Sequence, residues 1–392
     1  KPNAWLRAPV VEEDSHLVFS KHWGPLNQSL SLDGCHFICL DTPILNSGFK
    51  RECEQYDWLE SELCSATEKG QRLFVFMHYP LFICDPNEPT HYDNIDQPAR
   101  RRLLALFRQY GVKAVFSGHV HNFFLGMHGD TRFYSLPSTT FVRPEYSELA
   151  TVSPGDEFGR NDTAKLGFFL VNVYPDRHEV LPVRTYGAGS LTPGASQFEP
   201  GKMIGKSSSM LGVTLRQGWG RRVELAADGL DEFNRKEAYR DDLLLALLEL
   251  GVPSLRVPYA DLGNSDVRSR MADYVKLGFS FTLYSLAVPD DQVLETVDSY
   301  GDLIRQWELI FPEHLRNQVG DAIQKAQRVF SGQLFIAPVV PIKEAGKDSK
   351  TFQHFASHGF SSGQVAQVGK WRSMIPKQTG EIGLTFRVSP WD

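Results

Sequence analysis

Three histidines in two short motifs are the residues whose types and spacing best suit chemistry. His78 begins the motif His-Tyr-Pro after the apolar run 73–77, and His119 and His121 belong to a Gly-His-Val-His motif after the apolar run 112–117. Each run is typical of a parallel strand buried on both faces. The carboxyl ends of such strands share one edge of the sheet, where open α/β sheets place ligands. Since imidazole is the commonest transition-metal ligand, we predict a metal site formed by His78, His119 and His121.

The chain resembles the calcineurin-like metallophosphoesterases over roughly residues 15–185. The resemblance is carried by residues 29–34, 36–41 and 55–59 together with the two histidine motifs, and it is strongest for the branch near cyclic-nucleotide phosphodiesterases and purple acid phosphatases. It implies that His78 and His119 ligate one metal ion and that His121 ligates its neighbour.

Three motifs that the family also needs are not part of this resemblance. These are an Asp-x-His, a Gly-Asp that supplies a bridging aspartate, and an Asn-His pair, all upstream of the region seen here. The chain begins at Lys1, and we expect it to be truncated at the N-terminus. Two cations without a bridging carboxylate repel each other. As a hypothesis, this chain alone binds metal poorly and turns over little, whereas its parent is the enzyme.

The activity implied by the resemblance is hydrolysis of a phosphodiester or phosphomonoester. Two divalent ions (Mn, Fe or Zn) would activate a water for attack on a small phosphoester substrate. The catalytic acid stays unassigned, because the family often takes it from the missing Asn-His pair. His91 and Tyr92 lie in the polar loop 85–97 between the two histidine motifs, and we expect them to line the mouth of the substrate site.

Composition sets limits on the class of protein. A chain of 392 residues favours two domains, and 42% hydrophobic with 22% charged residues is typical of a globular protein. The net charge of −6 predicts no general attraction to nucleic acid. We also expect no membrane partner, since no apolar run approaches the ~20 residues of a membrane helix. An odd count of 5 cysteines argues against a disulfide framework and slightly favours a cytoplasmic location.

The first domain, residues 1–186, alternates strand and helix patterns. Helical spacing of apolar residues predicts helices over 55–69 and 97–110, and apolar runs predict strands over 35–40, 73–77, 112–117, 133–142 and 166–174. This order predicts the C-terminal portion of a layered metallophosphoesterase-like α/β sandwich.

A segment rich in Gly, Ser and Pro at residues 187–209 is typical of a linker. The second domain, residues 210–392, then repeats strand and helix. Strand patterns occur at 211–215, 254–258, 279–283, 303–310, 334–339 and 382–388, with helical patterns at 240–250 and 267–277. Six strands reached through helices predict an incomplete parallel β/α (TIM-like) barrel, and an open doubly wound sheet is the alternative.

The second domain contains no decisive motif. Polar residues at its expected strand ends are Gln217, Trp219, Asp261, Tyr284 and Glu308. Glu308 has the place of an acid in many barrel glycosidases, which need a second carboxylate as well. Two alternatives to the phosphoesterase therefore stay open: a non-catalytic protein that binds a ligand or carbohydrate, and a glycosidase-like hydrolase centred on this domain.

Overall fold

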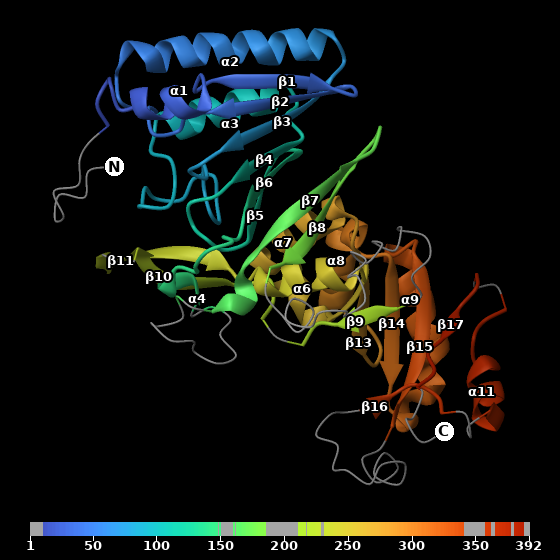
Figure 1. Cartoon of the computed structure of the whole chain (residues 1–392). Coiled ribbons are helices and arrows are strands. Elements are labelled where there is room, and N and C mark those ends of the chain that lie inside the picture. Colours follow the sequence, from blue (N-terminus) through green and yellow to red (C-terminus); the bar gives the residue numbers. More distant parts are fainter. Residues whose placement is uncertain are drawn as a thin grey trace, which may run out of the picture. The chain divides into compact units, whose positions relative to one another are not determined.

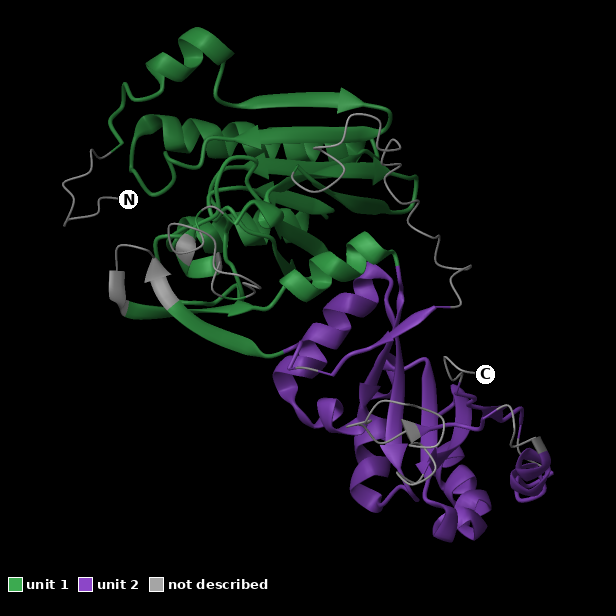
Figure 2. Cartoon of the chain, turned by 60° about the horizontal axis from the view of Figure 1, so that its bottom comes forward, with its two compact units in different colours: residues 1–203, 221–251 green, residues 204–220, 252–392 purple. Residues whose placement is uncertain are grey.

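The structure is a computed structural model that describes residues 11–147, 149, 160, 162–185, 211–216, 218–228, 231–340, 357–361, 365–377 and 380–387. It divides into unit 1, Lys1–Met203 with Arg221–Gly251, and unit 2, Ile204–Gly220 with Val252–Asp392 (Figure 2). The expected linker at 187–209 lies outside the described residues, as does Gln217. No helix in the described ranges has the length and apolar character to cross a membrane.

Unit 1 is built on a mixed six-stranded sheet whose order, β1-β2-β3-β4-β6-β5, runs down the upper part of Figure 1. The two edge strands are antiparallel to their neighbours and the strands between are parallel. The strand bounds are β1 Gln28–Leu32, β2 Cys35–Leu40, β3 Arg72–Met77, β4 Ala114–Ser117, β5 Phe124–His128 and β6 Thr131–Ser135. Mixed α/β architecture is thus confirmed, although the strand expected over 133–142 is wrong beyond Ser135, where β6 ends.

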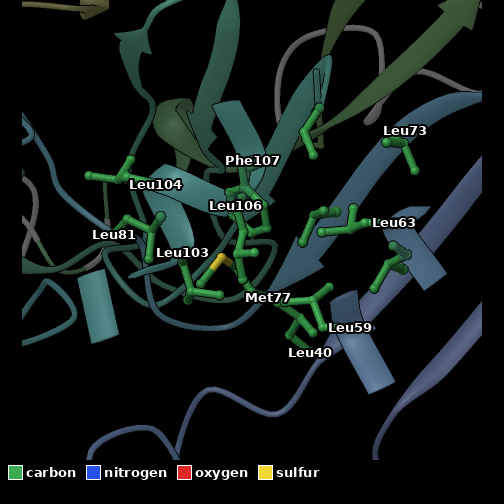
Figure 3. Close-up of a cluster of buried hydrophobic side chains, with 14 of the residues drawn as sticks. Leu40, Leu59, Leu63, Leu73, Met77, Leu81, Leu103, Leu104, Leu106 and Phe107 are labelled. Carbon is green, nitrogen blue, oxygen red and sulfur yellow. The ribbon is translucent and has the colours of Figure 1, made fainter. Parts of the chain in front are cut away.

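One face of this sheet is covered by α2 (Lys50–Glu68) and α3 (Ala99–Gln109). Apolar residues three and four positions apart put one side of each helix against the sheet. Figure 3 shows the resulting core, to which Leu59 and Leu63 of α2, Leu103, Leu104 and Phe107 of α3, and Leu40, Leu73 and Met77 of the strands contribute. Because β3 and β4 pack into this core, it fixes the direction of the segments that follow them.

The opposite face carries aromatic rings. Phe76 stacks on Phe116, and Phe116 on Tyr134, each pair with ring centroids 5.2 Å apart. The hairpin β7 (Gly167–Val173) and β8 (His178–Arg184) brings His178 edge-on to Phe74 at 5.6 Å. Burial, and then the nearby Arg132 and Arg72, lower the pKa of His178 to about 3.

The remaining elements of unit 1 are two helices, a 3-10 turn, a hairpin and a last helix. Their bounds are α1 Leu17–Trp23, α4 Pro144–Ser147, η3 Thr163–Lys165, β10 Arg222–Asp228, β11 Asp231–Tyr239 and α6 Asp242–Leu250. The β10–β11 hairpin escapes the sequence analysis, which assigned residues 221–251 to the second domain; the structure groups them with unit 1.

Unit 2 contains a sheet in which each parallel strand lies beside the next one in sequence. Its order is β16-β15-β14-β13-β12-β9, with β17 also paired to β15 and β16 antiparallel to β15. The strands are β9 Gly212–Thr214, β12 Ser254–Pro258, β13 Ser280–Leu286, β14 Gln306–Phe311, β15 Gln333–Val340, β16 Ser357–His358 and β17 Gly383–Leu384. The helices are α7 Ser265–Leu277, α8 Asp291–Tyr300, α9 Val319–Val329 and α11 Val365–Arg372, with 3-10 turns η4 Tyr259–Gly263, η5 Gly301–Leu303 and η6 Glu313–Gln318.

A first prediction concerns the core under α2. Leu59 is fully buried, so Leu59→Ala should lower the free energy of unfolding by about 2–5 kcal/mol through the cavity it leaves. Asp57 is exposed on the same helix, and Asp57→Ala should change stability by less than about 0.5 kcal/mol. Urea unfolding of both variants checks this, and equal effects would contradict the packing described above.

A second prediction concerns pH. His178 stays neutral in the folded chain at a pH where the unfolded chain takes up a proton, so its contribution to stability is present above pH 6.5 and falls as the pH drops toward 3. His178→Gln cannot titrate. Between pH 7.5 and 5 it should therefore lose about 1–2 kcal/mol less stability than the wild type. Urea unfolding at the two pH values measures this, and parallel losses would show that His178 titrates normally.

Candidate functional site

Two neighbouring parallel strands bring two of the predicted metal ligands together. β3 ends at Met77 opposite Ser117, the last residue of β4, and the pairing continues one step as the Gly118 N–H donates to the His78 carbonyl at 3.0 Å. The rings of His78 and His119 therefore lie side by side with centroids 5.2 Å apart. A Cβ on Gly118 would lie 3.9 Å from Nδ1 of His78, so this glycine leaves the backbone close to the ring.

The chain after β4 makes a tight turn that presents His119 and His121. The Val120 N–H donates to the Gly118 carbonyl at 2.8 Å. His119 and His121 have φ of 67° and 54°, in the left-handed region, which costs a non-glycine residue about 1 kcal/mol or more. Two exceptions of this kind within three residues are typical of a functional site rather than of an ordinary loop.

All three imidazoles are held in the neutral form that binds metals. Burial lowers the pKa of His78, and His121 lowers it further. Burial also lowers the pKa of His121 and brings that of His119 to about 3, where it outweighs the opposing effect of Asp93.

Hydrogen bonds orient two of these rings. Nδ1 of His121 donates to the Phe141 carbonyl at 3.1 Å, which leaves the lone pair on Nε2. His119 hydrogen-bonds the Tyr92 backbone, and its buried Nε2 has no hydrogen-bond partner among the described residues. A backbone carbonyl that fixes one ring nitrogen while the other stays available is the usual arrangement behind a metal-binding histidine.

A buried carboxylate lies next to His119. Asp93 is fully buried, and its Oδ1 is 3.6 Å from Nε2 of His119. Arg143 pairs with Oδ1, Lys236 pairs with Oδ2, and the Tyr146 hydroxyl donates to Oδ2 at 2.6 Å. Burial alone would raise the pKa of Asp93, but Lys236 and Arg143 together hold it below its usual range.

The sequence analysis missed the residues of this ion-pair network. Lys236 comes from β11 and is completely buried, with Nζ 4.0 Å from the centroid of the Tyr146 ring. Arg143 also pairs with Glu145, so two carboxylates balance two cations. No local pattern signals such a network, because its members are separated by up to about 140 residues of chain.

The loop 85–97 is ordered by Glu88, and it places the two predicted substrate residues differently. The Glu88 carboxylate accepts the Ile83 and Cys84 N–H groups at 2.9 and 2.8 Å and lies 3.0 Å from Nε2 of His91. His91 thus helps to stabilise the conformation of the loop. Tyr92 instead has its ring centroid 4.9 Å from that of His119, so it is the member of the pair that borders the histidines.

A cavity of about 350 Å³ opens in unit 1 on residues that follow His121. Asn122, Phe123, Phe124 and Tyr146 form part of its wall. Its cations Lys165 and Arg184 are paired with Asp162 and Glu249. The cavity thus shares Tyr146 with the Asp93 network and has a mostly apolar wall.

The described residues do not complete a metal centre. They contain no group of three or more His, Cys, Asp and Glu side chains placed to hold an ion. The chemistry of the histidines suits a divalent metal, but the carboxylate nearest to them, Asp93, is neutralised by Arg143 and Lys236. Metal ligation by His78, His119 and His121 therefore stays a prediction.

A third prediction tests the Asp93 network. Lys236→Met removes one cation from a buried pair and should cost about 3–5 kcal/mol of unfolding free energy. Lys50 pairs with Glu54 at the surface, and Lys50→Met should change stability far less than Lys236→Met. In urea unfolding, Lys236→Met combined with Asp93→Asn should be less destabilised than the sum of the single variants. Additive losses would show that the pair is not coupled.

Comparisons with known proteins find similarity in this region. Residues 7–123 match the family model for calcineurin-like phosphoesterase. The chain is 35% identical over 114 residues to the serine/threonine-protein phosphatase CPPED1 of Danio rerio, covering 28% of this chain and 37% of that protein. It is 33% identical over 119 residues to CPPED1 of Homo sapiens, covering 29% and 36%. The chain thus spans little more than a third of the length of these relatives.

A solved structure described as "GAP50 the anchor in the inner membrane complex of Plasmodium" is also similar, at 21% identity and a TM-score of 0.23 over 28% of this chain and 35% of that one. The family match includes both histidine motifs, which lie within residues 7–123. Residues 7–123 of this chain are thus similar to the calcineurin-like phosphoesterase family.

Proposed function

We propose that this chain is part of a metal-dependent phosphoesterase. The observation that carries the proposal is the pair of neutral imidazoles, His78 and His119, side by side at the ends of adjacent parallel strands within the family-matched residues. The family generally depends on divalent metal ions. His121, whose Nδ1 is fixed by a carbonyl, is the third ligand in this proposal.

In this proposal the remaining metal ligands come from residues outside the part of the chain that the structure describes. Three imidazoles would be divided between two ions, too few for a catalytic site, which usually keeps three protein ligands at each metal. The family resemblance puts the other ligands, including a bridging aspartate, upstream of the two histidine motifs. When both ions are bound, they supply a water of lowered pKa and neutralise charge on the phosphoryl oxygens.

The substrate side of the site is proposed from the rings around His119. Tyr92 and Tyr79 have ring centroids 4.9 and 4.2 Å from that of His119, so aromatic surface borders the histidines on two sides. We assign Tyr92 to the mouth of the substrate site and His91 to holding its loop. The relatives carry the name serine/threonine-protein phosphatase, which favours a phosphomonoester over a phosphodiester.

For unit 2 we propose a section of a parallel β/α barrel. Strands β9, β12, β13, β14, β15 and β17 follow one another in space in their order along the chain. A doubly wound sheet instead reverses its strand order at a switch point. Winding in one direction favours the barrel section, in which the helices cover one face of the sheet.

A fourth prediction tests the metal site by binding. Mn²⁺ or Zn²⁺ titrated into the chain in a calorimeter should bind, and His119→Ala should weaken the binding at least about tenfold because it removes a ligand rather than one of its supporting groups. His178 is the matched control, since it is also a buried histidine with a pKa of about 3 but lies on the aromatic face of the sheet. His178→Gln should leave metal affinity unchanged.

The same variants separate the reaction classes. With Mn²⁺ present, a longer form of the protein that also carries the remaining metal ligands should hydrolyse p-nitrophenyl phosphate faster than bis(p-nitrophenyl) phosphate, whereas this chain alone should turn over little. EDTA should stop both reactions of the longer form, and His119→Ala should lower its rate at least about a hundredfold. Both the longest natural form of the protein and this chain should be assayed, so that their rates can be compared. Metal affinity that His78→Ala, His119→Ala and His121→Ala all leave intact would refute the proposal.

A further inference from the structure

The sheet of unit 2 has one apolar and one polar face. Alternate residues of its strands point the same way, and the apolar set is fully buried: Leu255, Val257, Phe281, Leu283, Trp307, Leu309, Leu334 and Ile336. Tyr274 of α7 stacks on Phe281, and Phe330 at the end of α9 lies edge-on to Trp307. The helices therefore cover this face.

The other face carries polar side chains across four neighbouring strands. Arg256 of β12 lies opposite Thr282 of β13, which lies opposite Gln306 of β14 and then Gln333 of β15. Thr282 donates to the Gln306 amide oxygen at 2.9 Å, and Gln306 donates to Gln333 at 3.2 Å. Thr282, Gln306 and Gln333 are neutral hydrogen-bonding groups.

One step nearer the carboxyl ends of the strands, a buried carboxylate is the centre of a cluster. Glu308 of β14 is 3% exposed. Its Oε2 accepts from Nε of Arg256 at 2.8 Å and lies 2.6 Å from Nη2. The Arg256 guanidinium stacks 3.9 Å from the centroid of the Tyr284 ring, which in turn stacks on His358.

The second oxygen of Glu308 has no hydrogen-bond donor among the described residues. Nη2 of Arg256 lies 2.7 Å from Nε2 of His358. Since a guanidinium can only donate, Nε2 of His358 accepts this hydrogen bond and carries no proton. It therefore cannot donate to Oε1 of Glu308, which is 3.6 Å away. Oε1 is buried without a hydrogen-bond partner among the described residues, an arrangement that costs about 1–3 kcal/mol or more until a donor reaches it.

Charge and chemistry narrow the ligand that would satisfy this oxygen. The charges of Arg256 and Glu308 cancel, His358 is neutral, and Thr282, Gln306 and Gln333 offer hydroxyl and amide groups. A cluster without net charge gives no advantage to a phosphate or an ammonium group. A hydroxyl group can donate to Oε1, and adjacent hydroxyls of the same molecule can pair with Thr282 and Gln306.

We propose that the polar face of the unit 2 sheet, centred on Glu308, is a binding site for a neutral polyhydroxylated ring such as a sugar or cyclitol. Glu308 accepts a hydrogen bond from one ring hydroxyl, and Arg256 and His358 hold the carboxylate in place. Thr282, Gln306 and Gln333 contact the other hydroxyls. The site belongs to unit 2 and does not depend on the phosphoesterase proposal. Of the residues in this proposed site, the sequence analysis had singled out Glu308 and Tyr284.

The fifth prediction is tested by ligand-observed NMR titration of the whole chain with glucose and myo-inositol. Both should bind with dissociation constants in the millimolar range. Glucosamine and glucose 6-phosphate, which add a positive or a negative charge, should bind no more than about threefold more tightly than glucose. Glu308→Gln should weaken glucose binding at least tenfold, and Glu313→Gln, an exposed carboxylate paired with Arg316, should leave it unchanged.

A second variant tests the same site in case Glu308→Gln does not fold. Thr282→Val keeps the shape of the side chain and the Arg256–Glu308 pair while removing one hydroxyl from the face, and it should weaken glucose binding severalfold with an unchanged melting temperature. The proposal is overturned if neither polyol binds at 50 mM, if binding ignores both variants, or if either charged sugar binds more than tenfold more tightly than glucose.

Discussion

The environment of the buried Asp93 carboxylate is the constraint on which the candidate site of unit 1 depends. A charge taken out of water must be met by donors and opposite charge, and here Arg143, Lys236 and Tyr146 meet it. These residues come from the loop before α4, from β11 and from α4. The single carboxylate therefore ties two separate segments, residues 143–146 and β11, to the loop that also carries Tyr92.

The same interaction explains the state of the histidines. Because the negative charge of Asp93 is already compensated by two cations, it does not protonate His119 despite lying 3.6 Å from Nε2. Burial then dominates and the ring stays neutral. A neutral His119 beside a neutral His78 is a pair of metal-competent ligands, whereas a protonated ring would repel a cation.

Sequence alone could predict the meeting of His78 and His119, since strand periodicity and the shared edge of parallel strands are local rules that act over a few residues. It also predicted most of the described strands, β2 and β3 among them, and the helices α2, α3, α6 and α7, because their apolar spacing is regular, whereas α1, α4, α8, α9 and α11 were missed. It could not predict that Asp93 pairs with Lys236, because a charged residue in sequence has many possible partners. Burial and folding geometry choose among them, and the β10–β11 hairpin that carries Lys236 was itself missed.

Unit 2 shows a related limit. The alternation of polar and apolar residues along β12, β13 and β14 assigns one face to the helices, because residues such as Val257 and Leu309 cannot stay in water. Nothing equally strong requires a buried acid on the opposite face. Replacing the Arg256–Glu308 pair by apolar residues would cost little stability or even increase it, so stability alone does not explain why this pair is there. A buried carboxylate with one oxygen left without a donor among the described residues is better explained by binding than by folding.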